Sequence, residues 1–298
     1  MSGTINKVVI PVAGLGTRLL PATKSQPKEM LPVGRKPVVQ YVVEEMIEQH
    51  LTKYLFITGR SKRSIEDHFD RDPYLMSKLA ESGNTDLLDE IDYEAKGVNF
   101  FYTRQSSPAG LGDAIRLAED FAGDDHFVVA LGDTIVRSNG RPNTLVRRMI
   151  DAHTTHKASC TIAVWDVERN DVRQYGIVQP VGEVADVFEI SDIVEKPSPS
   201  DAPSCVAVAA RYILSPAIFP TLREIEPGVG GEVQLTDAIR LLIRRGHRVI
   251  CVKLQAHERR YDIGNTRSYF EAFIDFALSD RTHGQTLRRY IRKSLGET

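Results

Sequence analysis

Residues 7–33, KVVIPVAGLGTRLLPATKSQPKEMLPV, join a continuous β-branched run to a glycine turn and a cationic, proline-rich loop. The first six residues are typical of a strand buried on both faces of a parallel sheet. In open α/β sheets ligands bind where such strands end, and Gly14 and Gly16 let backbone N–H groups approach an anion there without a Cβ in the way. Three cations follow in the loop: Arg18, Lys24 and Lys28. The stretch therefore predicts an α/β fold with a cradle for a polyphosphate.

The spacing within this loop excludes two common phosphate-binding motifs. A dinucleotide fingerprint needs a third Gly or Ala where the chain has Leu19, and an acidic residue near the end of the second strand, where the chain reads ITGR at 57–60. A P-loop needs Gly-Lys followed by Ser or Thr, and no Gly in the loop precedes a Lys. Pro21, Pro27 and Pro32 prevent a long helix from following directly, which predicts an extended loop over the site. The alternative is an ordinary strand-to-helix connection with solvated charges.

Along the chain, short apolar runs alternate with helical patterns, as in βαβ units and a mostly parallel sheet. We expect strands near 7–12, 53–58, 98–103, 126–131, 158–164, 176–180, 186–194 and 205–213. We expect helices near 39–50, 61–69, 110–121, 143–154, 216–224 and 233–244. The helical stretch 73–94 is interpreted as an insertion that serves as a lid, a subunit contact or a plain solvated helix. The Arg-rich tail, residues 287–295, is expected to form an amphipathic helix docked on the body or on a second subunit.

Composition limits the classes of function. The chain has 298 residues and 42% hydrophobic content, enough for one large core or two fused modules. Its 38 Lys and Arg against 40 Asp and Glu give a net charge of -2, so no basic excess points to nucleic acid. No leader pattern and no apolar run of roughly 18 residues is present, which predicts a cytoplasmic protein without a membrane partner. Cys160, Cys205 and Cys251 lie singly in apolar runs and are expected to be reduced core residues.

The segments GLGTR, PATK, PKEMLP and KPVVQYVVEE between residues 12 and 45 closely resemble bacterial UTP–glucose-1-phosphate uridylyltransferases, which are sugar nucleotidyltransferases. The resemblance continues through RQSSPAGLGDAI (104–115), LGDTI (131–135), QYGIV (174–178), EKP (195–197), GEVQLTDAI (231–239) and YDIGN (261–265). It implies a Rossmann-like, mixed, mostly parallel sheet flanked by helices. We divide the chain into a nucleotide-binding core (1–170), a sugar-binding, sheet-completing part (171–265) and C-terminal helices (266–298), fused in one globular domain. Relatives of this kind commonly form homodimers or homotetramers.

The implied reaction is attack of glucose-1-phosphate on the α-phosphorus of UTP, giving UDP-glucose and pyrophosphate. A phosphate monoester is already anionic at neutral pH, so no side chain has to be activated as a nucleophile. The site has to align two mutually repelling anions and neutralise their charge, which Mg²⁺ bound by carboxylates does well. The resemblance assigns the magnesium to Asp133, directly after a predicted core strand, and to Asp262, just before a predicted helix. A turn residue and a helix cap are the respective alternatives.

The resemblance also assigns contacts with the nucleotide. They involve Ala13, Gly14, Gly16, Thr17, Arg18, Lys28, Glu29, Gln105, Gly110 and Asp133. The Gln105 amide and the turn at 110–112 can match the edge of uracil or thymine without separating the two, and a surface Gln beside a helix-starting turn is the alternative. Glu29 stands where thymidylyltransferases usually carry Gln, which favours UTP over dTTP. Gly132 replaces a Pro that is frequent in these enzymes, and Thr134 an apolar residue, which puts the local loop geometry in question.

The sugar and its phosphate are assigned to Gly176, Glu195, Lys196 and Val208. Glu195 can accept hydrogen bonds from sugar hydroxyls, and Lys196 offers an ammonium to the attacking phosphate. An exposed Glu-Lys pair at a strand end is the alternative. Arg18, Lys28, Asp133, Lys196 and Asp262 form the expected catalytic set.

Two further hypotheses stay open beside uridylyl transfer. The first is the same chemistry on another pair, with dTTP or another hexose-1-phosphate. The second is a non-catalytic nucleotide-binding regulator, which the complete set of charged residues disfavours. A nicotinamide oxidoreductase is more distant because the fingerprint fails. His153 and His156 lie three apart on a predicted helix, but without a third ligand we do not expect a zinc site.

Overall fold

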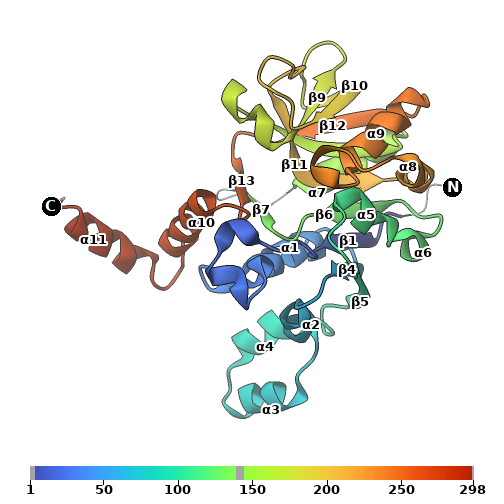
Figure 1. The fold of residues 1–298 in the computed structure, drawn as a ribbon. Coiled ribbons are helices and arrows are strands. Elements are labelled where there is room, and N and C mark those ends of the chain that lie inside the picture. Colours follow the sequence, from blue (N-terminus) through green and yellow to red (C-terminus); the bar gives the residue numbers. More distant parts are fainter. Residues whose placement is uncertain (1–3, 139–143, 297–298) are drawn as a thin grey trace.

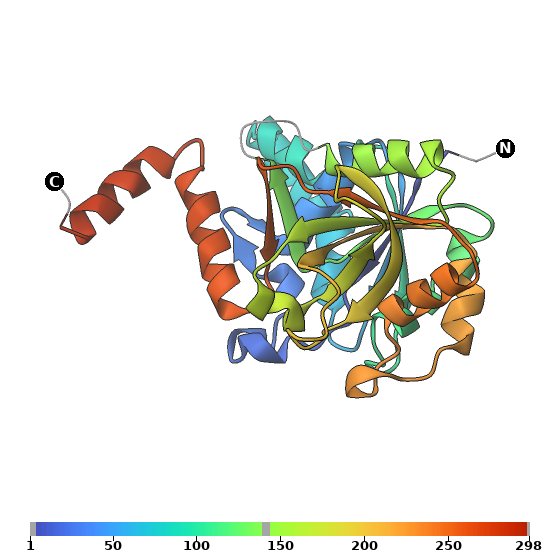
Figure 2. The same cartoon turned by 90° about the horizontal axis from the view of Figure 1, so that it is seen from above.

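A nine-stranded mixed sheet forms the centre of the protein (Figures 1 and 2) in the computed structural model, which describes residues 4–138 and 144–296. In spatial order its strands are β5 (Asn99–Arg104), β4 (Lys53–Thr58), β1 (Lys7–Pro11), β6 (Phe127–Ala130), β11 (Val206–Leu214), β8 (Cys160–Asp166), β12 (Val249–Lys253), β10 (Val187–Glu195) and β9 (Gly176–Pro180). β5, β4, β1 and β6 pair in parallel, as do β8 and β12, whereas β11 and β10 run against their neighbours. The Rossmann-like mixed, mostly parallel sheet is thereby confirmed.

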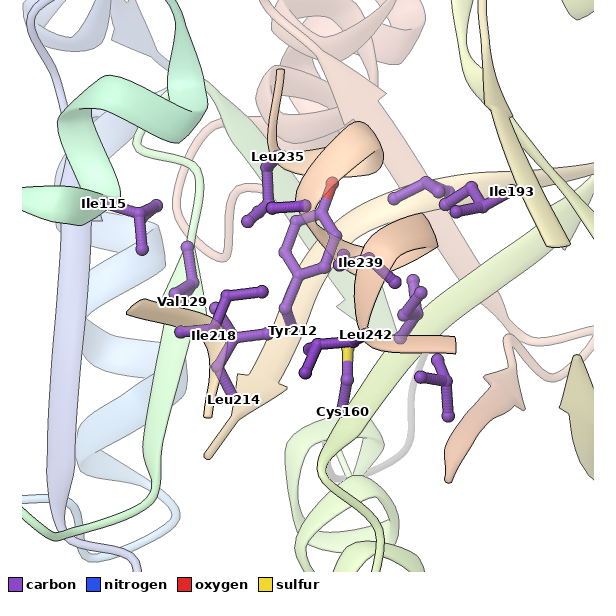
Figure 3. Close-up of a cluster of buried hydrophobic side chains, with 14 of the residues drawn as sticks. Ile115, Val129, Cys160, Ile193, Tyr212, Leu214, Ile218, Leu235, Ile239 and Leu242 are labelled. Atoms are coloured by element: carbon purple, nitrogen blue, oxygen red, sulfur yellow. The ribbon is translucent and has the colours of Figure 1, made fainter. Parts of the chain in front are cut away.

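Strand β1 lies in the middle of the parallel part because its side chains are apolar on both faces. Val9 packs into one core of the protein, and Val8 and Ile10 into the core on the opposite face, as the two-residue period of a strand requires. Figure 3 shows the first of these cores, in which Tyr212 and Leu214 of β11 lie beside Leu235, Ile239 and Leu242. The β-branched run at the start of the chain therefore becomes a fully buried strand whose end is held in place.

Helices cover both faces of the sheet. They are α1 (Val38–Ile47), α2 (Arg63–Phe69), α5 (Leu111–Arg116), α6 (Glu119–Ala122), α7 (Leu145–Thr155), α8 (Ile218–Glu224) and α9 (Leu235–Arg244). The single helix expected at 110–121 is two helices, because the N–H groups of Leu117 and Ala118 donate three residues back and end the α-helix in a tight turn. The start of the helix expected from residue 143 lies outside the described residues.

Two small β-structures were not expected from the sequence. β7 (Thr134–Ser138) pairs antiparallel with β13 (Glu258–Asp262), and β2 (Pro32–Val33) pairs with β3 (Lys36–Pro37). The loop after β1 contains three single-turn 3₁₀ helices, η1 (Thr17–Leu19), η2 (Ala22–Lys24) and η3 (Lys28–Met30), where an extended loop was expected. The β7–β13 ribbon matters most for the site, since it joins the middle of the chain to its end.

Four helices lie at the edges of the molecule. The insertion forms α3 (Pro73–Glu81) and α4 (Thr85–Ile91), and the chain ends in α10 (Thr266–Leu278) and α11 (Gly284–Ser294). Figures 1 and 2 show α11 projecting away from the body beyond α10, so docking on its own body, one of the two placements expected for the tail, is wrong. In the described ranges no helix has both the length and the apolar character needed to cross a membrane. The three cysteines are free, Cys160 and Cys251 being buried and Cys205 half-buried.

Candidate active site

A cavity of about 520 Å³ opens at the carboxyl ends of β1 and β6. It gathers residues from both halves of the chain, as expected for an open α/β sheet. The predicted site residues that line it are Ala13, Gly14, Arg18, Lys28, Glu29, Gln105, Gly110, Asp133, Gly176, Glu195, Lys196, Val208 and Asp262. Gly16, Thr17 and Lys24 are not among its lining residues. Gly16 has a φ of 69°, and its carbonyl accepts a hydrogen bond from Thr23 Oγ1 at 2.8 Å, so this glycine shapes the turn.

The β7–β13 ribbon brings the two proposed metal carboxylates together. Thr134 pairs with Asp262 in its register, and the Ile263 N–H donates to the Asp133 carbonyl at 2.9 Å. Asp133 and Asp262 therefore lie side by side at one end of the ribbon and both line the cavity. Two carboxylates beside room for phosphate oxygens form a donor set suited to a hard divalent cation. The residues present fit such an ion.

A short ion pair connects the glycine loop to this carboxylate pair. Lys28 Nζ lies 2.5 Å from Asp133 Oδ2. Burial lowers the pKa of Lys28, but the carboxylates of Asp133 and Glu29 outweigh burial and raise it above its usual value. For Asp133 burial acts in the other direction and raises the pKa. The Lys28 ammonium outweighs this effect and holds the pKa of Asp133 at about 2. Both groups are therefore charged at neutral pH, and one cation already faces the place where phosphate would bind.

Asp262 is held from two sides. Its Oδ1 accepts from the Gly264 N–H at 2.8 Å, and its Oδ2 accepts from Arg260 Nη2 at 3.1 Å. The Arg260 guanidinium is almost fully buried and lies 5.6 Å from the centre of the Trp165 ring and 5.2 Å from that of Tyr175. Arg260 was missed in the sequence, although its position two residues before Asp262 on one strand places both side chains on the same face.

The backbone around Asp133 is fixed from behind by a fully buried ion pair. Arg211 Nη2 lies 2.6 Å from Glu45 Oε2 and also donates to the Thr134 carbonyl at 2.9 Å. The loop geometry at residue 132 requires a glycine here, because a Cβ on Gly132 would lie 2.5 Å from Val12 Cγ1. Thr134 is buried, and its hydroxyl donates to Asp133 Oδ1 at 3.3 Å. Gly132 thus fits the turn, and Thr134 supports the Asp133 carboxylate.

The expected base-recognition residues also lie together. Gln105 Nε2 donates to the Gly110 carbonyl at 3.2 Å and to Asp113 Oδ2 at 2.7 Å, so the amide nitrogen holds the turn. Gly110 has a φ of 102°, and a Cβ on it would lie 2.6 Å from the Val233 carbonyl. The glycine is therefore required by close packing against residue 233, which the sequence did not reveal.

Glu29 is buried at the rim of the cavity and is not a free carboxylate. Its Oε2 lies 2.7 Å from Lys62 Nζ, and Lys62 directly precedes α2. Burial raises the pKa of Glu29 above its usual value in spite of this ammonium. The pair ties the cationic loop to the second βα unit.

The residues expected at the sugar lie together in the same cavity. Gly176 pairs with Glu195 in the β9–β10 register, and a Cβ on Gly176 would lie 2.9 Å from Thr236 Cγ2 and 3.3 Å from Val208 Cγ2. Glu195 Oε2 accepts from Thr236 Oγ1 at 3.0 Å, and Lys196 Nζ lies 3.4 Å from Glu195 Oε1. Lys196 has a φ of 45°, a left-handed backbone that is uncommon for a lysine. Glycine is needed at 176 because the side chains of Thr236, Glu195 and Val208 already fill that space.

Several lining residues were not assigned from the sequence. They include Leu131, Gln174, Tyr175, Ala210, Tyr212, Glu232, Gln234, Thr236, Arg260 and Asn265. Several of them stand inside segments singled out for resemblance, but a single sequence does not show which side of each segment faces the cavity. The described residues contain no cluster of three or more potential metal-binding side chains. His153 instead hydrogen-bonds to His126, with 2.6 Å between His153 Nε2 and His126 Nδ1.

The sheet, the glycine loop and the charged cavity together define a class of enzyme that joins nucleotidyl groups to phosphorylated acceptors. The nucleotidyl transferase family matches residues 7–278, and the chain therefore belongs to that family. The chain is 45% identical over 283 residues to the UTP–glucose-1-phosphate uridylyltransferase YngB of Bacillus subtilis. The matched region covers 93% of this chain and 91% of that protein.

Solved structures extend the likeness to the whole fold. A UDP-glucose pyrophosphorylase complexed with UDP-glucose has a TM-score of 0.83 at 37% identity and covers 92% of this chain and 98% of its own. A UTP-bound enzyme of this type from Acinetobacter baumannii has a TM-score of 0.86 at 35% identity and covers 97% and 99%. The resemblance to uridylyltransferases inferred from the sequence is confirmed.

Proposed function

We propose that the chain transfers the uridylyl group of UTP to glucose-1-phosphate, giving UDP-glucose and pyrophosphate. One observation carries this function: the paired carboxylates of Asp133 and Asp262, with Lys28, line the same cavity as the Glu195–Lys196 segment. The similarity to uridylyltransferases over nine-tenths of the chain supports this choice of substrates.

The reaction needs alignment of two anions and needs no nucleophilic side chain. Asp133 and Asp262 would hold Mg²⁺, which when bound neutralises charge on the phosphates. Arg18 and Lys28 balance the charge of the triphosphate from the side of the glycine loop. Lys196 offers its ammonium to the phosphate of the sugar. An oxygen of that phosphate then attacks the α-phosphorus of UTP while pyrophosphate leaves.

Selection of the base rests on Gln105. Because its amide nitrogen is engaged with Gly110 and Asp113, its carbonyl oxygen is the group left to accept the N3–H of uracil. The Glu29–Lys62 ion pair fixes the position of Glu29, the residue that stands where thymidylyltransferases usually carry Gln. Since uracil and thymine share this N3–H, we propose a preference for UTP over dTTP on the ground of Glu29 alone. We also propose that Glu195 and Gly176 shape the glucose site.

The wider organisation is proposed on similar terms. We retain the division at residues 170 and 265 into nucleotide-binding, sugar-binding and C-terminal parts. We also propose a cytoplasmic protein that assembles as a homodimer or homotetramer, and the projecting C-terminal helices support self-association.

The test is pyrophosphate release by the purified protein with Mg²⁺, measured over a grid of nucleoside triphosphates and hexose-1-phosphates, with chelator as the blank. We expect release above the blank chiefly with UTP and glucose-1-phosphate. A different best pair would keep the mechanism and overturn the substrate assignment. No release with any pair, together with UTP binding by calorimetry, would identify a non-catalytic regulator instead.

A further inference from the structure

The C-terminal arm, residues 266–296, presents a surface that the rest of the described chain does not cover. Phe276 of α10 packs on Tyr41, with ring centres 4.7 Å apart, and anchors the arm to the body. Beyond this anchor, Phe270 and Ile274 are exposed on α10, and Tyr290 and Leu295 are exposed on α11, Tyr290 by 67%. Exposed aromatic and aliphatic groups on a projecting element are typical of an interface.

The charge on α11 makes this helix unfavourable alone. It carries four cations and no carboxylate: Arg288, Arg289, Arg292 and Lys293. The first and third of these are four residues apart, as are the second and fourth, and like charges at that spacing destabilise a helix. None of the four forms an ion pair with a residue that the structure describes. An eleven-residue helix is marginal in water without a partner, so an acidic, partly apolar surface would stabilise it.

The acidic insertion, residues 73–94, has the complementary character. It contains six carboxylates and a single cation, Lys78. The side-chain carboxylates of Asp86 and Asp89 on α4 have no ion pair or hydrogen bond with the described residues. Tyr74 and Leu75 are exposed on α3, which has no buried residue. The insertion therefore offers both unpaired negative charge and apolar contact area.

The arm and the insertion of one chain cannot contact each other in this arrangement. Figures 1 and 2 show α11 and α3 projecting from the body in different directions. The turn between α10 and α11 is tight, since a Cβ on Gly284 would lie 2.5 Å from the Leu278 carbonyl, which keeps α11 near the end of α10. A second copy of the chain carries the same acidic surface without this constraint.

We propose that the C-terminal arm of one copy docks on the acidic insertion of a second copy, with α11 against α3 and α4. The contact is reciprocal in a closed dimer, because each copy supplies both an arm and an insertion. This proposal specifies the interface for the proposed self-association, and it rests on no step of the transfer reaction. Failure of the substrate grid would leave it standing, whereas failure of the experiment below would leave the activity standing.

The experiment compares two charge reversals in the full chain by light scattering across a concentration series at moderate ionic strength. Arg288→Glu with Arg292→Glu reverses two charges of α11, and Asp86→Arg with Asp89→Arg reverses two charges of α4. We expect each variant alone to dissociate at least tenfold more readily than the unaltered chain. An equimolar mixture should regain association, because in the mixed dimer the introduced glutamates face the introduced arginines at one contact and the unaltered charges face each other at the other.

The matched control reverses two exposed cations of the body, Arg63→Glu with Arg147→Glu, and should associate like the unaltered chain. Thermal unfolding of every variant shows that it is folded. The proposal is overturned if the unaltered chain is monomeric, if either reversal leaves association unchanged, or if mixing fails to restore it. Binding of the monomeric chain to anionic lipid vesicles would also overturn it and would assign the arm to a membrane surface.

Discussion

Replacing Asp133 by Asn tests the central assignment of the site. The amide keeps the shape of the side chain and an oxygen for Lys28 Nζ, now 2.5 Å from the carboxylate, but removes one of the two charges available to a metal. Loss of one preorganised electrostatic group typically lowers the rate by about 10²–10³-fold, or about 3–4 kcal/mol. We expect a loss of kcat/KM of this size and at least a tenfold higher Mg²⁺ concentration for half-maximal rate.

The same substitution should have a smaller effect on stability. Removing one partner of a buried ion pair costs about 3–5 kcal/mol when the other charge is stranded. Lys28 still faces the carboxylates of Glu29 and Asp262, so we expect about 1–2 kcal/mol, seen as a Tm lower by roughly 2–3 °C. Stability and activity should therefore separate.

The assay is pyrophosphate release over a Mg²⁺ titration at saturating UTP and glucose-1-phosphate, with differential scanning fluorimetry on the same samples. Asp151→Asn, an exposed carboxamide substitution on α7, is the matched control and should leave both curves unchanged. Normal turnover by the Asp133 variant at the usual Mg²⁺ concentration would remove Asp133 from the metal site. A large fall in Tm without a shift in the Mg²⁺ curve would make it a structural counterion of Lys28.

Three other substitutions have defined outcomes. Lys196→Ala should raise the KM for glucose-1-phosphate by about tenfold or more, and a rise confined to the KM for UTP would reverse the division of the site. Gly176→Ala should lower the free energy of unfolding in urea by about 1–3 kcal/mol and weaken use of the sugar phosphate. The reason is that the new Cβ would lie 2.9 Å from Thr236 Cγ2 and 3.3 Å from Glu195 Oε2. Unchanged kinetics with the sugar phosphate would argue against a sugar contact there. Burial and the neighbouring imidazole lower the pKa of His153 from 6.5 to about 4, so the contribution of His153 to the free energy of unfolding should be constant above about pH 6.5 and fall by about 3 kcal/mol as the pH drops to 4. His153→Gln should flatten that slope, and parallel urea-unfolding profiles for the two proteins would refute the assignment.

The parallel core and its phosphate loop could be predicted because their signals are local. The apolar run at 7–12 and the glycines after it specify a buried strand and a turn through neighbouring residues alone. The split of the helix at Leu117 and the three 3₁₀ turns of the loop depend on single hydrogen bonds that residue patterns do not encode. The position of Asp133 after a core strand could be predicted from its neighbours, whereas its joint role with Asp262 was predicted only from the resemblance, and the ribbon that pairs them was not.

The least predictable features join distant parts of the chain. The β7–β13 ribbon, the Arg211–Glu45 ion pair and the packing of Gly110 against Val233 all depend on three-dimensional contacts across long stretches of sequence. Arg260 lies close to two aromatic rings that its own segment does not contain. Residue type suggested chemistry at these positions, and only the fold shows which groups are engaged with one another.

The β7–β13 ribbon has a consequence for the order of events during synthesis. Asp133 leaves the ribosome with the first half of the protein, but its partner Asp262 is joined to it only when β13 has been made and has paired with β7. An incomplete chain can thus form the strand and the glycine loop after β1 yet lacks the second carboxylate. The two-carboxylate metal site is therefore completed near the end of chain synthesis, and a truncated product that ends before residue 258 would have half of it.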